Sequence, residues 1–150
     1  MIKNFEDSII DKFIEENNIK NILMEGSIGE FLYKGIEESK GEIISFLDDD
    51  DLFYNTKLEH VYNLFKNMDI VYYHNGPQFI NDSSEIINKT NTSPDFNISC
   101  ISIRKDMLPL IILREITMAQ DLLIYYISLD SNKKIIYDNI LLTYYRFHST

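Results

Sequence analysis

The amino-acid sequence predicts an α/β fold in which a mixed sheet is flanked by helices. Helical periods of apolar residues alternate with short apolar runs in the first half of the chain. The second half adds short strand-like segments around turn-forming residues, which predicts antiparallel additions to the sheet. The 150 residues, 45% of them hydrophobic, are enough for one domain with a core of its own.

The first half of the chain contains three predicted helices and three predicted strands in alternation. Gly41 ends the second helical period, and Asn55 or Thr56 is expected to cap the third helix. Residues 42–47 are apolar nearly throughout, which is typical of a strand covered on both faces in a parallel sheet. In chain order, we expect a helix over residues 5–14, a strand over 22–24, a helix over 28–36, a strand over 42–47, a helix over 58–65 and a strand over 69–74.

The second half begins with a predicted hairpin, because residues 78–80 and 86–87 flank the turn-forming sequence Asn81-Asp82-Ser83-Ser84. Residues 88–97 are rich in Asn, Thr and Ser, which predicts a loop. The single cysteine, Cys100, cannot form an internal disulfide and is expected to be buried in a strand. The remaining expected elements are that strand over residues 98–103, a helix over 120–128, and closing strands over 134–137 and 141–147.

Charge and hydropathy narrow the classes of partner. The 24 acidic and 14 basic residues give a formal net charge of -10, which opposes binding to nucleic acid or to an anionic membrane surface. A small phosphorylated ligand is still compatible with this charge if a divalent cation lies between carboxylates and phosphates. The apolar runs are far shorter than the roughly 18 residues of a membrane span, and no secretory leader pattern opens the sequence. We therefore expect a cytoplasmic protein.

Four consecutive aspartates, Asp48 to Asp51, directly follow the apolar residues 42–47. Their mutual repulsion disfavours this arrangement unless a cation is present, and oxygen ligands of this kind suit Mg²⁺ or Mn²⁺. On an extended chain, Asp48 and Asp50 point to one side and Asp49 and Asp51 to the other. Ligands of open α/β sheets bind beyond the carboxyl ends of the strands, where this run falls. A divalent ion there would neutralise the charge on a departing diphosphate, which indicates sugar transfer from a nucleotide sugar.

Two other interpretations of the aspartate run stay open. The run could be a solvated acidic turn before the next helix, since acids near a helix start are favourable. A calcium-binding loop fits less well, because the run lacks the alternating ligands and the glycine of an EF-hand loop.

Residues 41–51, Gly-Glu-Ile-Ile-Ser-Phe-Leu-Asp-Asp-Asp-Asp, with Lys57-Leu58 beyond them, resemble the central block of family 2 glycosyltransferases. The resemblance implies a GT-A fold, the fold of nucleotide-diphospho-sugar transferases. It also implies that Asp50 is the main metal ligand, with Mg or Mn as the cofactor. Asp48 and Asp49 would then contact the ribose, the metal or the diphosphate of the donor.

Two later segments support the resemblance. Residues 98–104 resemble the family's strand followed by basic residues and a helix, and Gln120-Asp121-Leu122 follows at a similar distance, with Gln120 in place of the usual Glu. By this resemblance Asp121 is the general base that takes the proton from the acceptor hydroxyl in an inverting displacement. Its other interpretation is an acid in the first turn of a helix.

The end of the sequence, Tyr144-Tyr145-Arg146-Phe147-His148, resembles the family's closing Tyr-Arg-x-His pattern. Arg146 would therefore meet the diphosphate, and His148 would assist the metal or the phosphate. The other interpretations are an ion pair for Arg146 and a structural role for His148.

The resemblance covers roughly residues 19–149 and departs from the family in two places. The first strand, the Pro-x-Tyr-Asn segment and the later Asp-rich segment that cradle the nucleoside have no counterpart here. Phe31-Leu32-Tyr33 stands where an Ala-Arg-Asn triplet usually holds the donor. We therefore expect residues 1–150 to form a single glycosyltransferase-like domain, N-terminally shortened and truncated relative to the full GT-A fold.

The expected function is metal-dependent, inverting transfer of a sugar from a nucleotide-diphosphate sugar to a saccharide or lipid-linked acceptor. The alternative is a non-catalytic binding or regulatory module of glycosyltransferase-like fold. In either case, a second copy or a partner chain could complete the sheet edge that the shortening would expose.

Overall fold

The computed structural model describes residues 1–88 and 97–148. Most of the loop predicted over residues 88–97 lies outside the described residues. The chain divides into two compact units. One contains Met1–Lys40 and Pro109–Gln120, and the other contains Gly41–Leu108 and Asp121–Thr150.

The first unit contains a short parallel pair of strands and three helices. Strands β1 (Ile2–Lys3) and β2 (Ile22–Leu23) pair in parallel. Each of the two longer helices begins at a side-chain cap, which satisfies amide groups that would otherwise lack a partner. Asp7 accepts hydrogen bonds from two amides of the first turn of α1, and Ser27 forms a capping box with Glu30 in α2. The helices are α1 (Ser8–Glu16), α2 (Ile28–Glu38) and α4 (Leu110–Arg114).

Gly29 allows α2 to approach the segment that follows α4. A Cβ atom at this position would lie 2.4 Å from the carbonyl oxygen of Leu113 and 2.5 Å from that of Ile116. The amide of Gly29 donates a hydrogen bond to the oxygen of Ile116 at 3.2 Å. Any larger side chain would therefore push these backbone segments apart.

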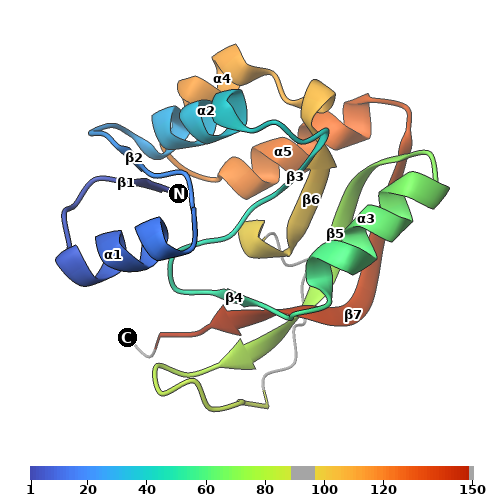
Figure 1. The fold of residues 1–150 in the computed structure, drawn as a ribbon. Coiled ribbons are helices and arrows are strands. Elements are labelled where there is room, and N and C mark those ends of the chain that lie inside the picture. Colours follow the sequence, from blue (N-terminus) through green and yellow to red (C-terminus); the bar gives the residue numbers. More distant parts are fainter. Residues whose placement is uncertain (89–96, 149–150) are drawn as a thin grey trace. The chain divides into compact units, whose positions relative to one another are not determined.

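The second unit is built on a five-stranded mixed sheet with the strand order β3-β6-β5-β7-β4 (Figure 1). The strands β5 and β7 pair in parallel, and the other three pairs are antiparallel. Strands β3, β5 and β7 consequently run in the same direction, and β5 and β7 end together, whereas β3 ends opposite Tyr73 of β5. The strands are β3 (Ile43–Ser45), β4 (Leu52–Phe53), β5 (Ile70–Ile80), β6 (Ile101–Arg104) and β7 (Lys134–Arg146).

Two helices pack on opposite faces of this sheet. Val61 and Phe65 of α3 (Lys57–Asn67) join Tyr73 of β5 in a buried cluster. The next side chain towards the N-terminus, Tyr72, points to the other face, where its ring lies 5.9 Å from that of Tyr125 in α5 (Gln120–Asp130). The expected α/β fold with a mixed sheet flanked by helices is confirmed.

Several expected elements differ in detail. Residues 98–100 form the 3-10 helix η1 (Ile98–Cys100) instead of a strand, because the side chain of Asn97 accepts a hydrogen bond from the Ser99 amide at 2.7 Å and starts a turn. A second 3-10 helix, η2 (Lys105–Met107), follows β6. Cys100 is buried as expected. Thr56 precedes α3 but its side chain makes no capping hydrogen bond.

The prediction of a parallel environment for residues 42–47 is wrong. Among the described residues, strand β3 lies at the edge of the sheet and pairs with β6 alone, in antiparallel register. Its apolar residues are half-buried. The hairpin after β5 is confirmed only as a single antiparallel bridge between Ile80 and Ile86.

The two closing strands expected at residues 134–137 and 141–147 are one strand, β7. The pairing of His74 with Tyr137 is followed by that of Gly76 with Leu141, so β7 accommodates two extra residues in a bulge. A Cβ atom on Gly76 would lie 3.0 Å from the backbone of Asn139 within this bulge. Residues 138–140 therefore form a bulge in β7, and the strand continues after them.

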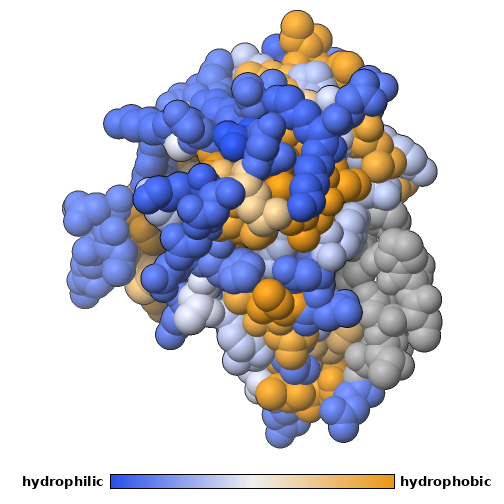
Figure 2. Space-filling view, turned by 90° about the vertical axis from the view of Figure 1, so that its right-hand side faces the viewer, coloured by the Kyte–Doolittle hydropathy of each residue, from blue (hydrophilic) through white to orange (hydrophobic). Residues whose placement is uncertain are grey.

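Large apolar side chains also reach the surface. Leu58 and Tyr62 on α3 are 59% and 57% exposed. On the face in Figure 2, hydrophobic surface forms patches that are separated by hydrophilic side chains, a pattern that is normal on protein surfaces. Within residues 1–88 and 97–148, no helix combines the length and the hydropathy that a bilayer span requires.

Candidate functional site

The candidate site lies at the carboxyl ends of β5 and β7, where the pairing of β4 with β7 brings in the aspartate run. The aspartate run Asp48 to Asp51 follows β3, Asp82 follows β5, and His148 follows β7 (Figure 1). Ligands of open α/β sheets bind beyond the carboxyl ends of such strands. The topology thus gathers acidic and imidazole side chains from three distant parts of the sequence at one end of the sheet.

The imidazole of His148 lies between two carboxylates. Its Nε2 atom is 2.9 Å from Oδ2 of Asp50, and its Nδ1 atom is 2.6 Å from Oδ1 of Asp82. All three side chains are accessible, with exposed fractions of 59% for His148, 36% for Asp50 and 60% for Asp82. The hydrogen bonds to Asp50 and then to Asp82 raise the pKa of His148 above its usual value.

Asp51 differs from the rest of the run because it is buried. Its Oδ1 atom accepts a hydrogen bond from the backbone amide of Arg146 at 2.8 Å, and its Oδ2 atom accepts one from Asn97 at 3.4 Å. This carboxylate therefore ties the end of the aspartate run to β7 and to the start of η1. We assign it a structural role.

Asp48 and Asp49 are exposed. Loss of hydration around its carboxyl group is the largest cause that raises the pKa of Asp48, to about 6. Nearby negative charge raises the pKa of Asp48 further. That charge comes from Asp51, Asp50, Asp49 and Asp121.

Asp121 lies in the first turn of α5, as the sequence predicts. Its Oδ1 atom accepts a hydrogen bond from the amide of Leu122 at 2.8 Å, so it does stabilise the helix start. Its charge also acts on Asp48. Asp121 and the aspartate run thus belong to one electrostatic environment.

The guanidinium group of Arg146 is occupied by backbone and side-chain acceptors. Its Nε atom donates to the oxygen of Asp50 at 2.9 Å, and Nη1 donates to the oxygen of Asn81 at 2.8 Å. Further bonds reach the oxygen of Asp82 and the hydroxyl of Ser84. Arg146 therefore joins the aspartate run to the turn after β5, and contact with a diphosphate would require some of these bonds to exchange.

Lys57 is a buried cation beneath the site, and sequence reasoning gave it no role. Its ammonium group donates to the oxygen of Ser99 and to the hydroxyl of Thr143, the latter at 2.9 Å. It also lies 4.0 Å from the centre of the Phe53 ring. Burial lowers the pKa of Lys57 to about 8. Ser99 in turn accepts a hydrogen bond from the Asp48 amide at 2.9 Å, so Lys57 supports the start of the aspartate run.

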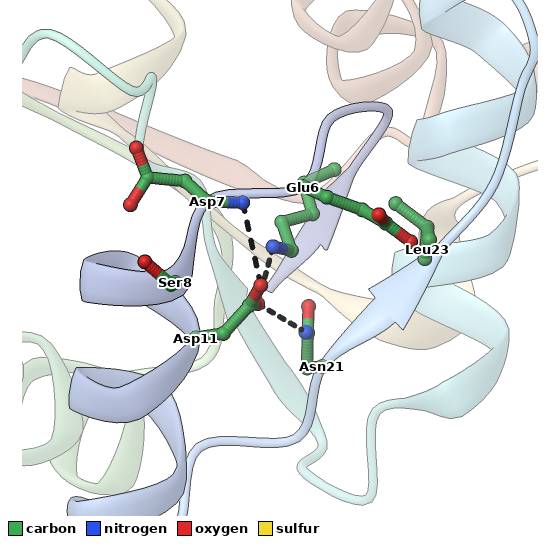
Figure 3. A pocket seen from close by; sticks show the side chains of 7 residues that line it. Glu6, Asp7, Ser8, Asp11, Asn21 and Leu23 are labelled. Carbon is green, nitrogen blue, oxygen red and sulfur yellow. Dashed lines mark hydrogen bonds and ion pairs between the residues drawn. The ribbon is translucent and has the colours of Figure 1, made fainter.

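A separate hollow lies elsewhere, in the first unit. It measures about 430 Å³ and contains none of the site residues that the sequence predicts. Its central carboxylate, Asp11, already accepts hydrogen bonds from the side chains of Lys3 and Asn21 and from the amide of Asp7 (Figure 3). These contacts fasten the start of α1 next to β1, which explains the polar lining without a ligand.

The sequence profile described as glycosyl transferase family 2 matches residues 8–123, more than half of the chain. The chain belongs to glycosyltransferase family 2. No curated protein sequence gave a match.

Solved structures share the fold of this family 2 chain. The structure of S. aureus TarS 1-349 in complex with UDP-GlcNAc superimposes with a TM-score of 0.75 at 13% identity, covering 99% of this chain and 49% of TarS 1-349. The complex with UDP gives a TM-score of 0.73 at 14% identity, covering 97% and 50%. The chain thus spans about half the length of these structures. The comparison confirms a GT-A-like fold.

The donor atoms of this family 2 site are of two kinds that bind divalent cations, a carboxylate oxygen and an imidazole nitrogen. Asp50 and His148 supply an oxygen and an imidazole nitrogen that point at each other, and both side chains are accessible. Across the described part of the chain, no group of three or more His, Cys, Asp and Glu side chains is arranged to hold a metal. Mg²⁺ commonly takes one or two protein ligands and completes its shell with water and phosphate oxygens. Two protein ligands are therefore compatible with a metal that binds together with a diphosphate.

Proposed function

We propose that the second unit carries the site of a metal-dependent glycosyltransferase, which transfers a sugar from a nucleoside-diphosphate sugar to an acceptor hydroxyl with inversion. The observation that carries this proposal is the pairing of Asp50 and His148, which lie 98 residues apart in sequence and 2.9 Å apart in space. In this family 2 chain, the pairing brings together the aspartate run and the closing segment of the sequence, which are two of the segments that resemble the family.

Asp50 and His148 are the residues that would hold Mg²⁺ or Mn²⁺ in this proposal. The bound ion would act as a Lewis acid that stabilises the negative charge on the leaving nucleoside diphosphate. Asp48 and Asp49 are exposed next to this position and are assigned to the ribose and diphosphate side of the donor. Arg146 would add positive charge if its bonds to the turn after β5 exchange for the diphosphate.

Asp121 is assigned the role of general base. Its carboxylate would accept the proton of the acceptor hydroxyl while that oxygen forms a bond to the anomeric carbon. The bond from the anomeric carbon to the phosphate oxygen breaks on the opposite side, and its electron pair leaves with the nucleoside diphosphate.

The donor class follows from the family and from the relatives. TarS 1-349 has been crystallised with UDP and with UDP-GlcNAc. Uridine diphosphate sugars are therefore the first donors to test. The second candidate function is a non-catalytic module, and it is favoured by Phe31-Leu32-Tyr33 on α2, where the family usually carries an arginine toward the donor.

A turnover assay tests the proposal. Release of nucleoside diphosphate from a panel of UDP- and GDP-sugars would be measured with saccharide acceptors, with and without Mn²⁺. We expect Mn²⁺-dependent release that falls at least about 100-fold in Asp121→Asn, in line with the usual contribution of a general base. Asp130→Asn, at the other end of the same helix, is the matched control and should keep its activity. Release that is independent of both Mn²⁺ and Asp121 would contradict the proposed mechanism, and folded protein without any turnover would favour the non-catalytic module.

A further inference from the structure

Asp82 has no part in the reaction proposed above, yet it makes a short hydrogen bond at the site. Its Oδ1 atom lies 2.6 Å from Nδ1 of His148, while Nε2 of the same ring faces Asp50. The two nitrogens of an imidazole are on different edges of the ring. A carboxylate bonded to Nδ1 therefore leaves Nε2 available on the side of Asp50.

We propose that Asp82 is a positioning residue, which fixes the orientation and the tautomer of His148 by accepting a hydrogen bond from its Nδ1 atom. This inference rests on the proposed function, in which Nε2 of His148 binds the cation. Histidines that bind metals usually donate their second nitrogen to a carboxylate or a carbonyl, and loss of that partner typically costs 10- to 100-fold in metal affinity.

The turn that carries Asp82 is held by several hydrogen bonds. The side chain of Asn81 accepts hydrogen bonds from the amides of Ser83 and Glu85, at 3.0 and 2.9 Å. Ser84 has a φ angle of 62°, a left-handed conformation that non-glycine residues seldom adopt. The guanidinium of Arg146 donates hydrogen bonds to the carbonyl oxygens of Asn81 and Asp82.

The same strand pair places His148 opposite this turn. The amide of Phe147 donates to the carbonyl oxygen of Ile80 at 2.8 Å, which extends the pairing of β5 and β7 by one hydrogen bond. His148 and Asp82 therefore each follow closely on residues that are bonded to each other. The backbone pairing thus brings the two residues close together, and both side chains are more than half exposed.

The test combines metal binding with the state of the histidine ring. Binding of Mn²⁺ alone would be measured by electron paramagnetic resonance for the wild type, Asp82→Ala, His148→Ala and the double variant. Glu85→Gln is the matched control, because it removes one negative charge from the same turn without touching His148. The ring nitrogens of His148 would be observed in the metal-free protein by long-range ¹H–¹⁵N correlation.

We expect Asp82→Ala to weaken Mn²⁺ binding about 10- to 100-fold, whereas Glu85→Gln should change this binding less than about threefold. In the His148→Ala background, Asp82→Ala should have no further effect on Mn²⁺ binding. Unchanged Mn²⁺ binding in Asp82→Ala, or an equal loss in the His148→Ala background, would overturn the positioning role and leave the proposed function intact. Wild-type protein that binds no Mn²⁺ would instead refute the metal-dependent function. The positioning role would then be decided by whether the Nδ1-bound proton of His148 is lost in Asp82→Ala.

Discussion

Replacement of Lys57 by methionine tests the arrangement beneath the aspartate run. Lys57 is completely buried, and burial lowers its pKa from 10.5 to about 8. Between these two pH values, the unfolded chain keeps a proton that the folded protein has released. The free energy of unfolding must therefore rise with pH in this window, by the linkage between proton binding and folding.

The magnitude follows from the two pKa values. The gap between 10.5 and about 8 corresponds to roughly 3 kcal/mol, of which about 2 kcal/mol is gained between pH 7 and about pH 9.5. Lys57→Met has a side chain of similar length and no titrating group, so it lacks this gain. Relative to the variant, the wild type should become about 2 kcal/mol more stable over the same range.

Urea unfolding followed by circular dichroism at the two pH values measures this difference. Lys66→Met is the matched control, because Lys66 is an exposed lysine on the same helix α3. The control should follow the pH dependence of the wild type. A constant stability difference between wild type and Lys57→Met from pH 7 to about pH 9.5 would refute the reasoning, because it would mean that the buried ammonium group keeps its ordinary pKa.

Three further substitutions test other parts of the structure. Gly29→Ala should destabilise the first unit by about 1–3 kcal/mol in thermal unfolding, because the added Cβ atom would lie 2.4 Å from the oxygen of Leu113; an unchanged melting temperature would contradict the close approach. Asp51→Ala should lower the free energy of unfolding by about 1–3 kcal/mol, because it removes a buried hydrogen-bond acceptor. Asp49→Ala, at an exposed position, should leave this free energy nearly unchanged. Equal effects of the two substitutions would argue against burial of Asp51. The pKa of Asp48 is raised from 3.8 to about 6. Between these two pH values, the folded protein holds a proton that the unfolded chain has lost. The free energy of unfolding should therefore fall as the pH rises from 3.8 to about 6. Urea unfolding of Asp48→Asn should lack that fall, and an identical slope in both proteins would locate the titrating group elsewhere.

The sequence was most informative where structure is set locally. The helical periods predicted α1, α2, α3 and α5, because the apolar face of a helix is visible in consecutive residues. The aspartate run was evident as a short segment of unusual residues, and Arg146 and His148 were identified by resemblance to the closing pattern of the family. Their proximity in space follows from the pairings of β7 with β4 and with β5, which sequence periodicity does not encode.

The features that sequence reasoning missed depend on pairings between distant segments. Asp82 was interpreted as part of a turn, because Asn-Asp-Ser-Ser is a common turn sequence, and its contact with His148 requires the long pairing of β5 with β7. The burial of Asp51 depends on the amide of Arg146. Lys57 was visible in the sequence as a lysine shortly after the aspartates. Only the fold shows that its ammonium group is buried.

The central claim is that Asp50 and His148 bind a divalent cation together with a nucleoside diphosphate. The most direct measurement is a calorimetric titration of the full chain with UDP, in the presence and absence of Mn²⁺, for the wild type and Asp50→Asn. The account predicts saturable UDP binding that requires Mn²⁺ and is weakened at least about 10-fold in Asp50→Asn. UDP binding of equal strength without Mn²⁺, or in Asp50→Asn, would contradict it.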